Sequence, residues 1–266
     1  MMKRRFDRDF FRQVSTLASI LAAFFINIWS NLNPIGDLTI GEISNTLLGD
    51  VLVTPANYAF SIWGLIYLGL IGFGIYQLQP PQRKHPDLRK LGYLLVASSI
   101  AQILWVFLFQ WRFFVLSLGA MVAILLPLIW AYRKLRIGKK LVPLKFKWLV
   151  HIPVSIYLAW ISVATIVNAA VALYAIDWQG WGISTVSWTI AMVAVAALLG
   201  AIVVGRRRDL AFPGVVVWAL VAIAIRHTEI PSIAIASASS AIALSIWVGF
   251  RVFRTQKGLK NYGRSF

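Results

Sequence analysis

Residues 149–174 read LVHIPVSIYLAWISVATIVNAAVALY, an apolar run without aspartate, glutamate, lysine or arginine. A run of this length crosses the hydrocarbon core of a membrane as a helix. Seven further apolar segments lie at about 14–33, 57–78, 91–110, 113–131, 184–204, 210–226 and 232–250. The sequence therefore predicts an all-α integral membrane protein with about eight transmembrane helices.

The composition supports this fold class. Hydrophobic residues make up 59% of the chain and charged residues only 13%, whereas soluble domains have about 25% charged residues. The apolar residues form long runs and do not show the alternation of membrane β-barrel strands. This leaves no room for a soluble catalytic domain, and the lack of cysteine excludes disulfides and cysteine metal sites.

The net charge of +17 is distributed between the apolar segments. All lysines and arginines except Arg112 and Arg226 fall on one side of the predicted membrane topology. Membrane topology explains this pattern better than nucleic-acid binding, because the charges do not form one patch. We therefore expect both termini in the cytoplasm and the protein in the cytoplasmic (plasma) membrane, with no nucleic-acid partner.

A polar and aromatic stripe runs along the fifth apolar segment. Trp160, Ala164 and Asn168 are four residues apart, so they share one face of a helix. An amide in the hydrocarbon region is costly without a hydrogen-bond partner. Asn168 is therefore expected to face protein or a cavity.

Two other segments place aromatic and amide groups at a similar depth, in the outer half of the membrane. These groups are Tyr58, Phe60, Trp63 and Tyr67 on the second segment, and Gln102 and Trp105 on the third. The pattern predicts an aromatic-lined pocket with a few polar contacts. The alternative is that these side chains only pack the helices together, with the amides of Gln102 and Asn168 bonded to each other or to a neighbouring helix.

The first external loop, about 34–56, contains no basic residue and ends in Val-Thr-Pro55-Ala. A loop of this length is either a lid over a binding site or a plain connection. The sequence leaves both readings open.

These residues resemble those of the TspO/MBR family, the tryptophan-rich sensory proteins related to the translocator protein. The resemblance covers about residues 14–175 and departs from the family pattern at Tyr58, where tryptophan is usual, and at Gln102, where asparagine is usual. It implies a five-helix TspO-like bundle in residues 1–175, with 176–266 as a three-helix extension ending in a basic tail. The ligand-binding residues that it implies are Pro55, Tyr58, Phe60, Trp63, Tyr67, Gln102, Trp105, Trp160, Ala164 and Asn168.

The leading expectation is that the protein binds, and transports or senses, a flat hydrophobic ligand such as a porphyrin, another tetrapyrrole or a sterol-like molecule. Three alternatives stay open: a transporter without ion coupling, porphyrin photo-oxidation as proposed for some relatives, and an assembly role in a membrane complex. No catalytic motif, metal site or required cofactor is recognised. The expected partners are the lipid bilayer, the hydrophobic ligand and a second copy of the chain, packed through the small residues of the last helix.

Overall fold

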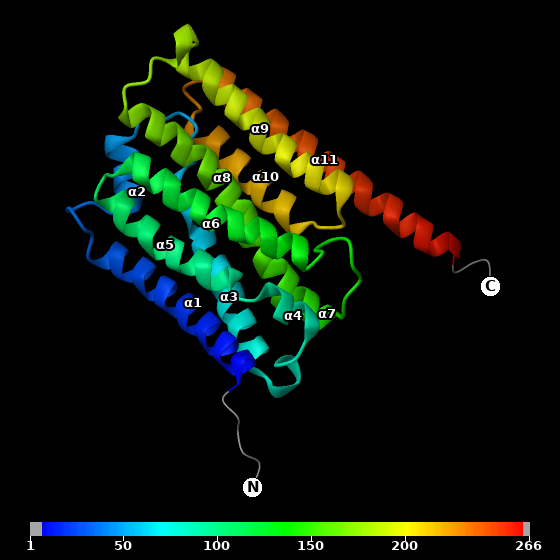
Figure 1. Ribbon diagram of the computed structural model, residues 1–266. Coiled ribbons are helices and arrows are strands. Elements are labelled where there is room, and N and C mark those ends of the chain that lie inside the picture. The colour runs from blue at the N-terminus through cyan, green and yellow to red at the C-terminus, as the bar shows by residue number, and fades with distance from the viewer. Residues whose placement is uncertain (1–6, 263–266) are drawn as a thin grey trace. The chain divides into compact units, whose positions relative to one another are not determined.

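The computed structural model describes the backbone of residues 7–262 and the side chains of residues 7–254, and every regular element in this range is a helix (Figure 1). The chain forms two compact units. The first comprises Met1–Val51 and Phe60–Trp178, and the second comprises Leu52–Ala59 and Gln179–Phe266. The second unit thus includes a short segment that precedes the second long helix, as well as the last three helices.

Five long helices build the first unit: α1 (Arg8–Leu32), α3 (Ile62–Leu78), α5 (Leu94–Gln110), α6 (Phe114–Lys134) and α8 (Ile152–Ala175). Helix α5 packs against α1 and α6, α6 packs against α8, and α3 packs against α1 and α8 (Figure 1). Shorter elements connect them: α2 (Ile40–Glu42), the π-helix η1 (Ile43–Leu47), the 3₁₀-helix η3 (Pro80–Gln82), α4 (Pro86–Leu91), α7 (Leu144–Phe146) and the π-helix η4 (Lys147–His151). The five helices correspond to the first five apolar segments of the sequence.

Local chemistry explains where two of these helices begin. Asp7 caps α1 by accepting a hydrogen bond from the backbone N–H of Phe10 at 3.0 Å. In α8, Pro153 lacks an N–H and its ring crowds the preceding turn. The π-helical turn of η4 lies directly before this proline, where a widened turn accommodates the missing hydrogen bond.

The second unit contains α9 (Thr185–Arg206), α10 (Ala211–Arg226) and α11 (Pro231–Tyr262), which pack against one another, and the 3₁₀-helix η5 (Gly180–Gly182). The 3₁₀-helix η2 (Asn57–Ser61) spans the junction in the chain between the second and the first unit. On α11 the small residues Ser237 and Ala241 are buried within the unit. These two residues of the small-residue face therefore pack inside the chain.

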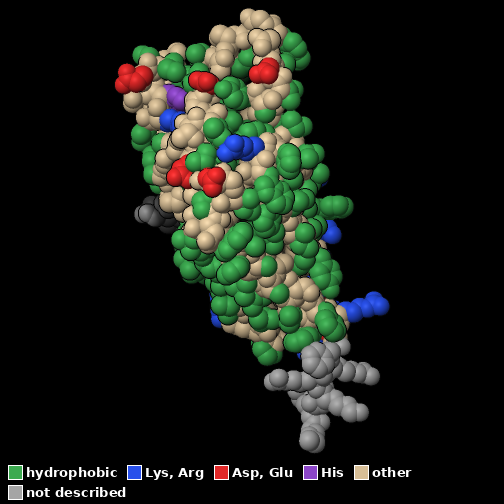
Figure 2. Space-filling model, turned by 90° about the vertical axis from the view of Figure 1, so that its left-hand side faces the viewer, with side chains coloured by type: hydrophobic (Ala, Val, Ile, Leu, Met, Phe, Trp, Pro, Cys, Tyr) green, Lys and Arg blue, Asp and Glu red, His purple; other side chains and the backbone are tan. Residues whose placement is uncertain are grey.

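Within residues 7–262, six helices are long and apolar enough to cross a membrane: Arg8–Leu32, Asn57–Leu78, Phe114–Lys134, Leu144–Ala175, Thr185–Arg206 and Pro231–Arg254. The apolar helices α5 and α10 are shorter, with 17 and 16 residues. At about 1.5 Å per residue they still approach the thickness of a hydrocarbon core. Large apolar side chains such as Leu68 and Trp130 are exposed, and hydrophobic side chains cover much of the face drawn in Figure 2.

Gly69 permits a close contact between α3 and α8 in the first unit. A Cβ atom added at Gly69 of α3 would lie 3.1 Å from the Cβ of Pro153 on α8, whereas a Cβ at Gly64 would meet nothing within 4 Å. We expect Gly69→Val to lower the free energy of unfolding by about 1–3 kcal/mol through overpacking. Denaturant titration in detergent micelles measures this change, with Gly64→Val on the same helix as the matched control. Equal losses in the two variants would contradict the close contact.

Candidate functional site

Five aromatic side chains of the first unit lie together. The Trp63 ring stacks on Tyr67 with a centroid distance of 5.6 Å and meets Tyr157 edge-on at 6.1 Å. Phe60 meets Trp160 edge-on, also at 6.1 Å. These spacings arise because Trp63 and Tyr67 share one face of α3, as Tyr157 and Trp160 do on α8. We call these five residues the aromatic cluster.

An amide from a third helix joins the aromatic cluster. Gln102 on α5 is only 1% exposed, and its Oε1 accepts a hydrogen bond from the Tyr157 hydroxyl at 3.5 Å. Its Nε2 is buried and has no hydrogen-bond partner among the residues that the structure describes. A buried donor without an acceptor costs about 1–3 kcal/mol. The first unit therefore holds a donor that an acceptor atom of a ligand would satisfy.

The two tyrosines of the aromatic cluster are held in place by contacts with neighbouring helices. The Tyr67 hydroxyl donates a hydrogen bond to the backbone carbonyl of Ala23 on α1 at 3.1 Å, and the Phe24 ring lies 5.1 Å from the Tyr67 ring. Tyr67, Tyr157 and Trp160 are all buried. Because the Tyr67 hydroxyl is bonded to α1 and the Tyr157 hydroxyl to α5, a change of either side chain to another χ1 rotamer would break a hydrogen bond.

Asn168 has a different role from Gln102. Its Oδ1 accepts a hydrogen bond from Trp105 Nε1 at 2.7 Å, and its Nδ2 donates to Ser117 Oγ at 2.9 Å. This buried asparagine thus links α8 to α5 and α6, which confirms that it faces protein. Ala164, one turn before it, is half-buried. Asn168 and Gln102 do not bond to each other; each has its own partners.

Two of the candidate residues, Pro55 and Tyr58, lie in the second unit. The Tyr58 ring meets Trp218 of α10 edge-on at 5.0 Å, and the Pro55 carbonyl accepts a hydrogen bond from Arg226 at 3.4 Å. Two further bonds join Leu52–Ala59 to α10: Trp218 Nε1 donates to the Ala59 carbonyl at 3.2 Å, and the Ala56 N–H donates to the Ala222 carbonyl at 3.1 Å. The end of the first external loop is therefore held by α10.

Trp218→Phe removes the hydrogen bond to Ala59 and keeps most of the apolar contact. We expect faster hydrogen exchange of the backbone amides in Leu52–Ala59, corresponding to a loss of about 1 kcal/mol of local stability. Hydrogen–deuterium exchange mass spectrometry measures it. The control is Trp247→Phe, at an exposed position on α11, which should leave the exchange of this segment unchanged. Unchanged exchange in Trp218→Phe would show that α10 does not hold the segment.

Two residues of this region were missed by the sequence analysis. Tyr157 precedes Trp160 by three residues. Helical spacing therefore places Tyr157 on the same face as Trp160, as it does Asn168. Ser117, the partner of Asn168, is one serine in an apolar helix and carries no pattern of its own. Among residues 7–262, no group of three or more histidine, aspartate and glutamate side chains is placed to hold a metal ion.

The apolar helices and the exposed apolar side chains define an all-α integral membrane protein, which confirms the expected fold class. The family model for TSPO-like proteins matches residues 13–250, and the chain belongs to this family. The match extends over the last three helices, beyond the part in which the sequence resemblance was recognised. No curated protein and no solved structure matches the chain.

Proposed function

We propose that the first unit binds a flat hydrophobic ligand of the porphyrin, tetrapyrrole or sterol-like class. One observation carries this proposal: the aromatic cluster lies beside the unpartnered Nε2 of Gln102. Aromatic faces supply dispersion and stacking area for a flat ligand. A ligand that also carries a carbonyl, carboxylate or hydroxyl oxygen would accept the hydrogen bond that the described residues do not accept.

Membership of the TSPO-like protein family supports the same proposal, because the sequence resemblance implies a ligand of this kind.

The proposal includes movement or sensing of the ligand in the cytoplasmic membrane, with both termini on the cytoplasmic side. The distribution of lysine and arginine supports this orientation. A fluorescent protein fused to the C-terminus should then fold and fluoresce, and alkaline phosphatase fused there should stay inactive.

Titration of the purified full chain with protoporphyrin IX in detergent, followed by tryptophan fluorescence and porphyrin absorbance, tests ligand binding. We expect saturable binding that weakens about tenfold or more, which equals about 1.4 kcal/mol, in the Trp160→Phe/Ala164→Phe variant. The matched control is Trp148→Phe, since Trp148 is 61% exposed and lies outside the aromatic cluster. Competition by cholesterol would assign the sterol-like class.

Two outcomes would contradict the proposal. Unsaturable quenching of the same size in all variants would mean that the porphyrin only partitions into the micelle. An equal loss of affinity in Trp148→Phe and in the double variant would place the binding site outside the aromatic cluster.

A further inference from the structure

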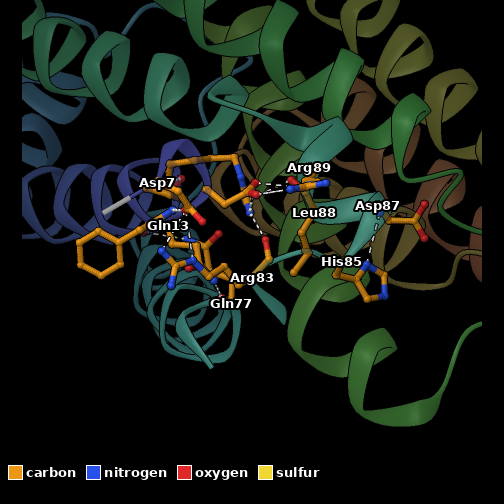
Figure 3. Close-up of polar contacts among 12 residues, drawn as sticks. Asp7, Gln13, Gln77, Arg83, His85, Asp87, Leu88 and Arg89 are labelled. Carbon is orange, nitrogen blue, oxygen red and sulfur yellow. Dashed lines mark hydrogen bonds and ion pairs between the residues drawn. The ribbon is translucent and has the colours of Figure 1, made fainter. Parts of the chain in front are cut away.

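Some of the basic residues at one end of the first unit form ion pairs with carboxylates of the same unit. Arg83 forms an ion pair with Asp7 at 2.9 Å, and Arg89 pairs with Asp9 (Figure 3). A third pair joins Lys140 to Asp87 at 2.7 Å. Burial raises the pKa of Asp87, but the hydrogen bond and charge of Lys140 outweigh it, so the net shift is downward and the carboxylate stays ionised. At this end, three carboxylates pair with part of the positive charge.

The second unit carries a comparable group of arginines at one of its ends. Helix α9 ends in this region and α10 begins shortly after it, and α11 passes beside the end of α9. Arg251 on α11 donates hydrogen bonds to the carbonyls of Val204 at 3.3 Å and Gly205 at 2.7 Å, which places the arginines of α11 next to those of the α9–α10 connection. We call this group, Arg206, Arg207, Arg208, Arg251 and Arg254, the arginine cluster.

The second unit offers little negative charge to balance the arginine cluster. Between residues 179 and 254 the carboxylates are Asp209 and Glu229. Asp209 is buried and accepts a hydrogen bond from the Ala211 N–H at 3.0 Å, and Glu229 follows the opposite end of α10. The side chains of Arg206, Arg208 and Arg254 are exposed and form no ion pair with the described residues. These three guanidinium groups are accessible to an anionic group outside the chain.

Aromatic side chains indicate the depth of the arginine cluster in the membrane. Trp247, Phe250 and Phe253 on α11 are exposed within one turn of Arg251 or Arg254. The Arg254 guanidinium lies 4.5 Å from the centroid of the Phe250 ring, and Trp247 stacks with Phe250 at 6.4 Å. Exposed aromatic residues near the end of a membrane helix mark the level of the lipid headgroups. The arginine cluster is therefore expected at the level of the lipid headgroups.

We propose that the arginine cluster of the second unit is a binding site for the headgroups of anionic phospholipids. Guanidinium groups bind phosphate oxygens through two parallel hydrogen bonds. A basic group next to the cytoplasmic end of membrane helices also attracts anionic lipids electrostatically. The occupant is a membrane lipid because the arginines border the exposed aromatic residues of α11. The proposal is independent of the ligand proposed for the first unit.

Native mass spectrometry of the purified full chain tests the site, with phosphatidylglycerol and phosphatidylcholine offered in equal amounts. We expect wild type to retain phosphatidylglycerol preferentially, and R206Q/R208Q/R254Q to lose about tenfold or more of that preference. The control R133Q/R136Q/K139Q removes the same charge from exposed positions of the first unit and should keep the preference. R206K/R208K/R254K retains the charge but loses the paired hydrogen bonds of the guanidinium groups, so it should keep only part of the preference.

Three results would overturn the proposal. Equal binding of both lipids by wild type would show that headgroup charge is not recognised. An equal loss of preference in the two triple glutamine variants would show that the net charge of the protein, and not the arginine cluster, determines which lipid is bound. Inorganic phosphate at the concentration of the lipid could displace phosphatidylglycerol fully, which would make this a site for free phosphate. A preference of wild type that weakens as sodium chloride rises from about 0.1 to 1 M supports the proposal without any variant.

Discussion

Replacing Asn168 with leucine should lower the free energy of unfolding by about 1–3 kcal/mol. The substitution removes both interhelical hydrogen bonds of this residue and leaves the buried Trp105 Nε1 without an acceptor. Adding Trp105→Phe should recover part of the loss, because the second change removes the unsatisfied donor. Denaturant titration in mixed micelles gives all the free energies of this double-mutant cycle.

The control for Asn168→Leu is Thr165→Val on the same helix. The Thr165 hydroxyl bonds only to the Ile161 carbonyl of its own helix, so its removal should cost about 0.5 kcal/mol or less. A loss in Asn168→Leu no larger than in Thr165→Val would contradict the role of Asn168 as a link between three helices. Additive losses in the cycle would contradict a direct bond between Asn168 and Trp105.

Replacing Gln102 with leucine should weaken ligand binding with little change in stability. The change removes the unpartnered Nε2, but it also removes the Oε1 that accepts the hydrogen bond of the buried Tyr157 hydroxyl. The gain and the loss oppose each other, so the free energy of unfolding of the ligand-free protein should change by about 1 kcal/mol or less. The same change should weaken porphyrin binding about tenfold or more, which equals about 1.4 kcal/mol. Loss of binding with little loss of stability is typical of a residue retained for function.

Helix α5 supplies a matched control for this substitution. Gln110 is also buried, but its Nε2 donates a hydrogen bond to the Ser30 carbonyl at 2.8 Å. Gln110→Leu should therefore lower the free energy of unfolding and leave porphyrin affinity unchanged. Denaturant titration and porphyrin titration on both variants check the prediction. A loss of stability in Gln102→Leu as large as in Gln110→Leu would show that both amides are structural.

The fold class could be predicted because hydrophobic run length and charge distribution are local properties of the sequence. The same holds for Trp160 and Asn168, since helical spacing puts them on one face of α8. The different roles of Gln102 and Asn168 could not be predicted. Both are amides in apolar helices, and only the three-dimensional positions of Tyr157 and Ser117 separate them.

The sequence also could not predict that Pro55 and Tyr58 lie in the second unit. Tyr58 precedes Phe60 by two residues, so helical continuity favours one common site for both. The structure begins α3 only at Ile62 and bonds Leu52–Ala59 to Trp218 and Ala222 of α10. These contacts join residues more than a hundred positions apart, and no local pattern encodes them.

The most direct test of the central claim observes the side-chain amide of Gln102. With glutamine labelled by ¹⁵N, the amide signals of Gln102 are assigned by their absence in Gln102→Leu, and protoporphyrin IX is then titrated into the full chain in micelles. The account predicts that these signals shift saturably as Nε2 gains an acceptor, while those of Gln110 stay in place. Saturable porphyrin binding that leaves the Gln102 signals unmoved would contradict it, because the ligand would then lie away from the aromatic cluster and its free amide.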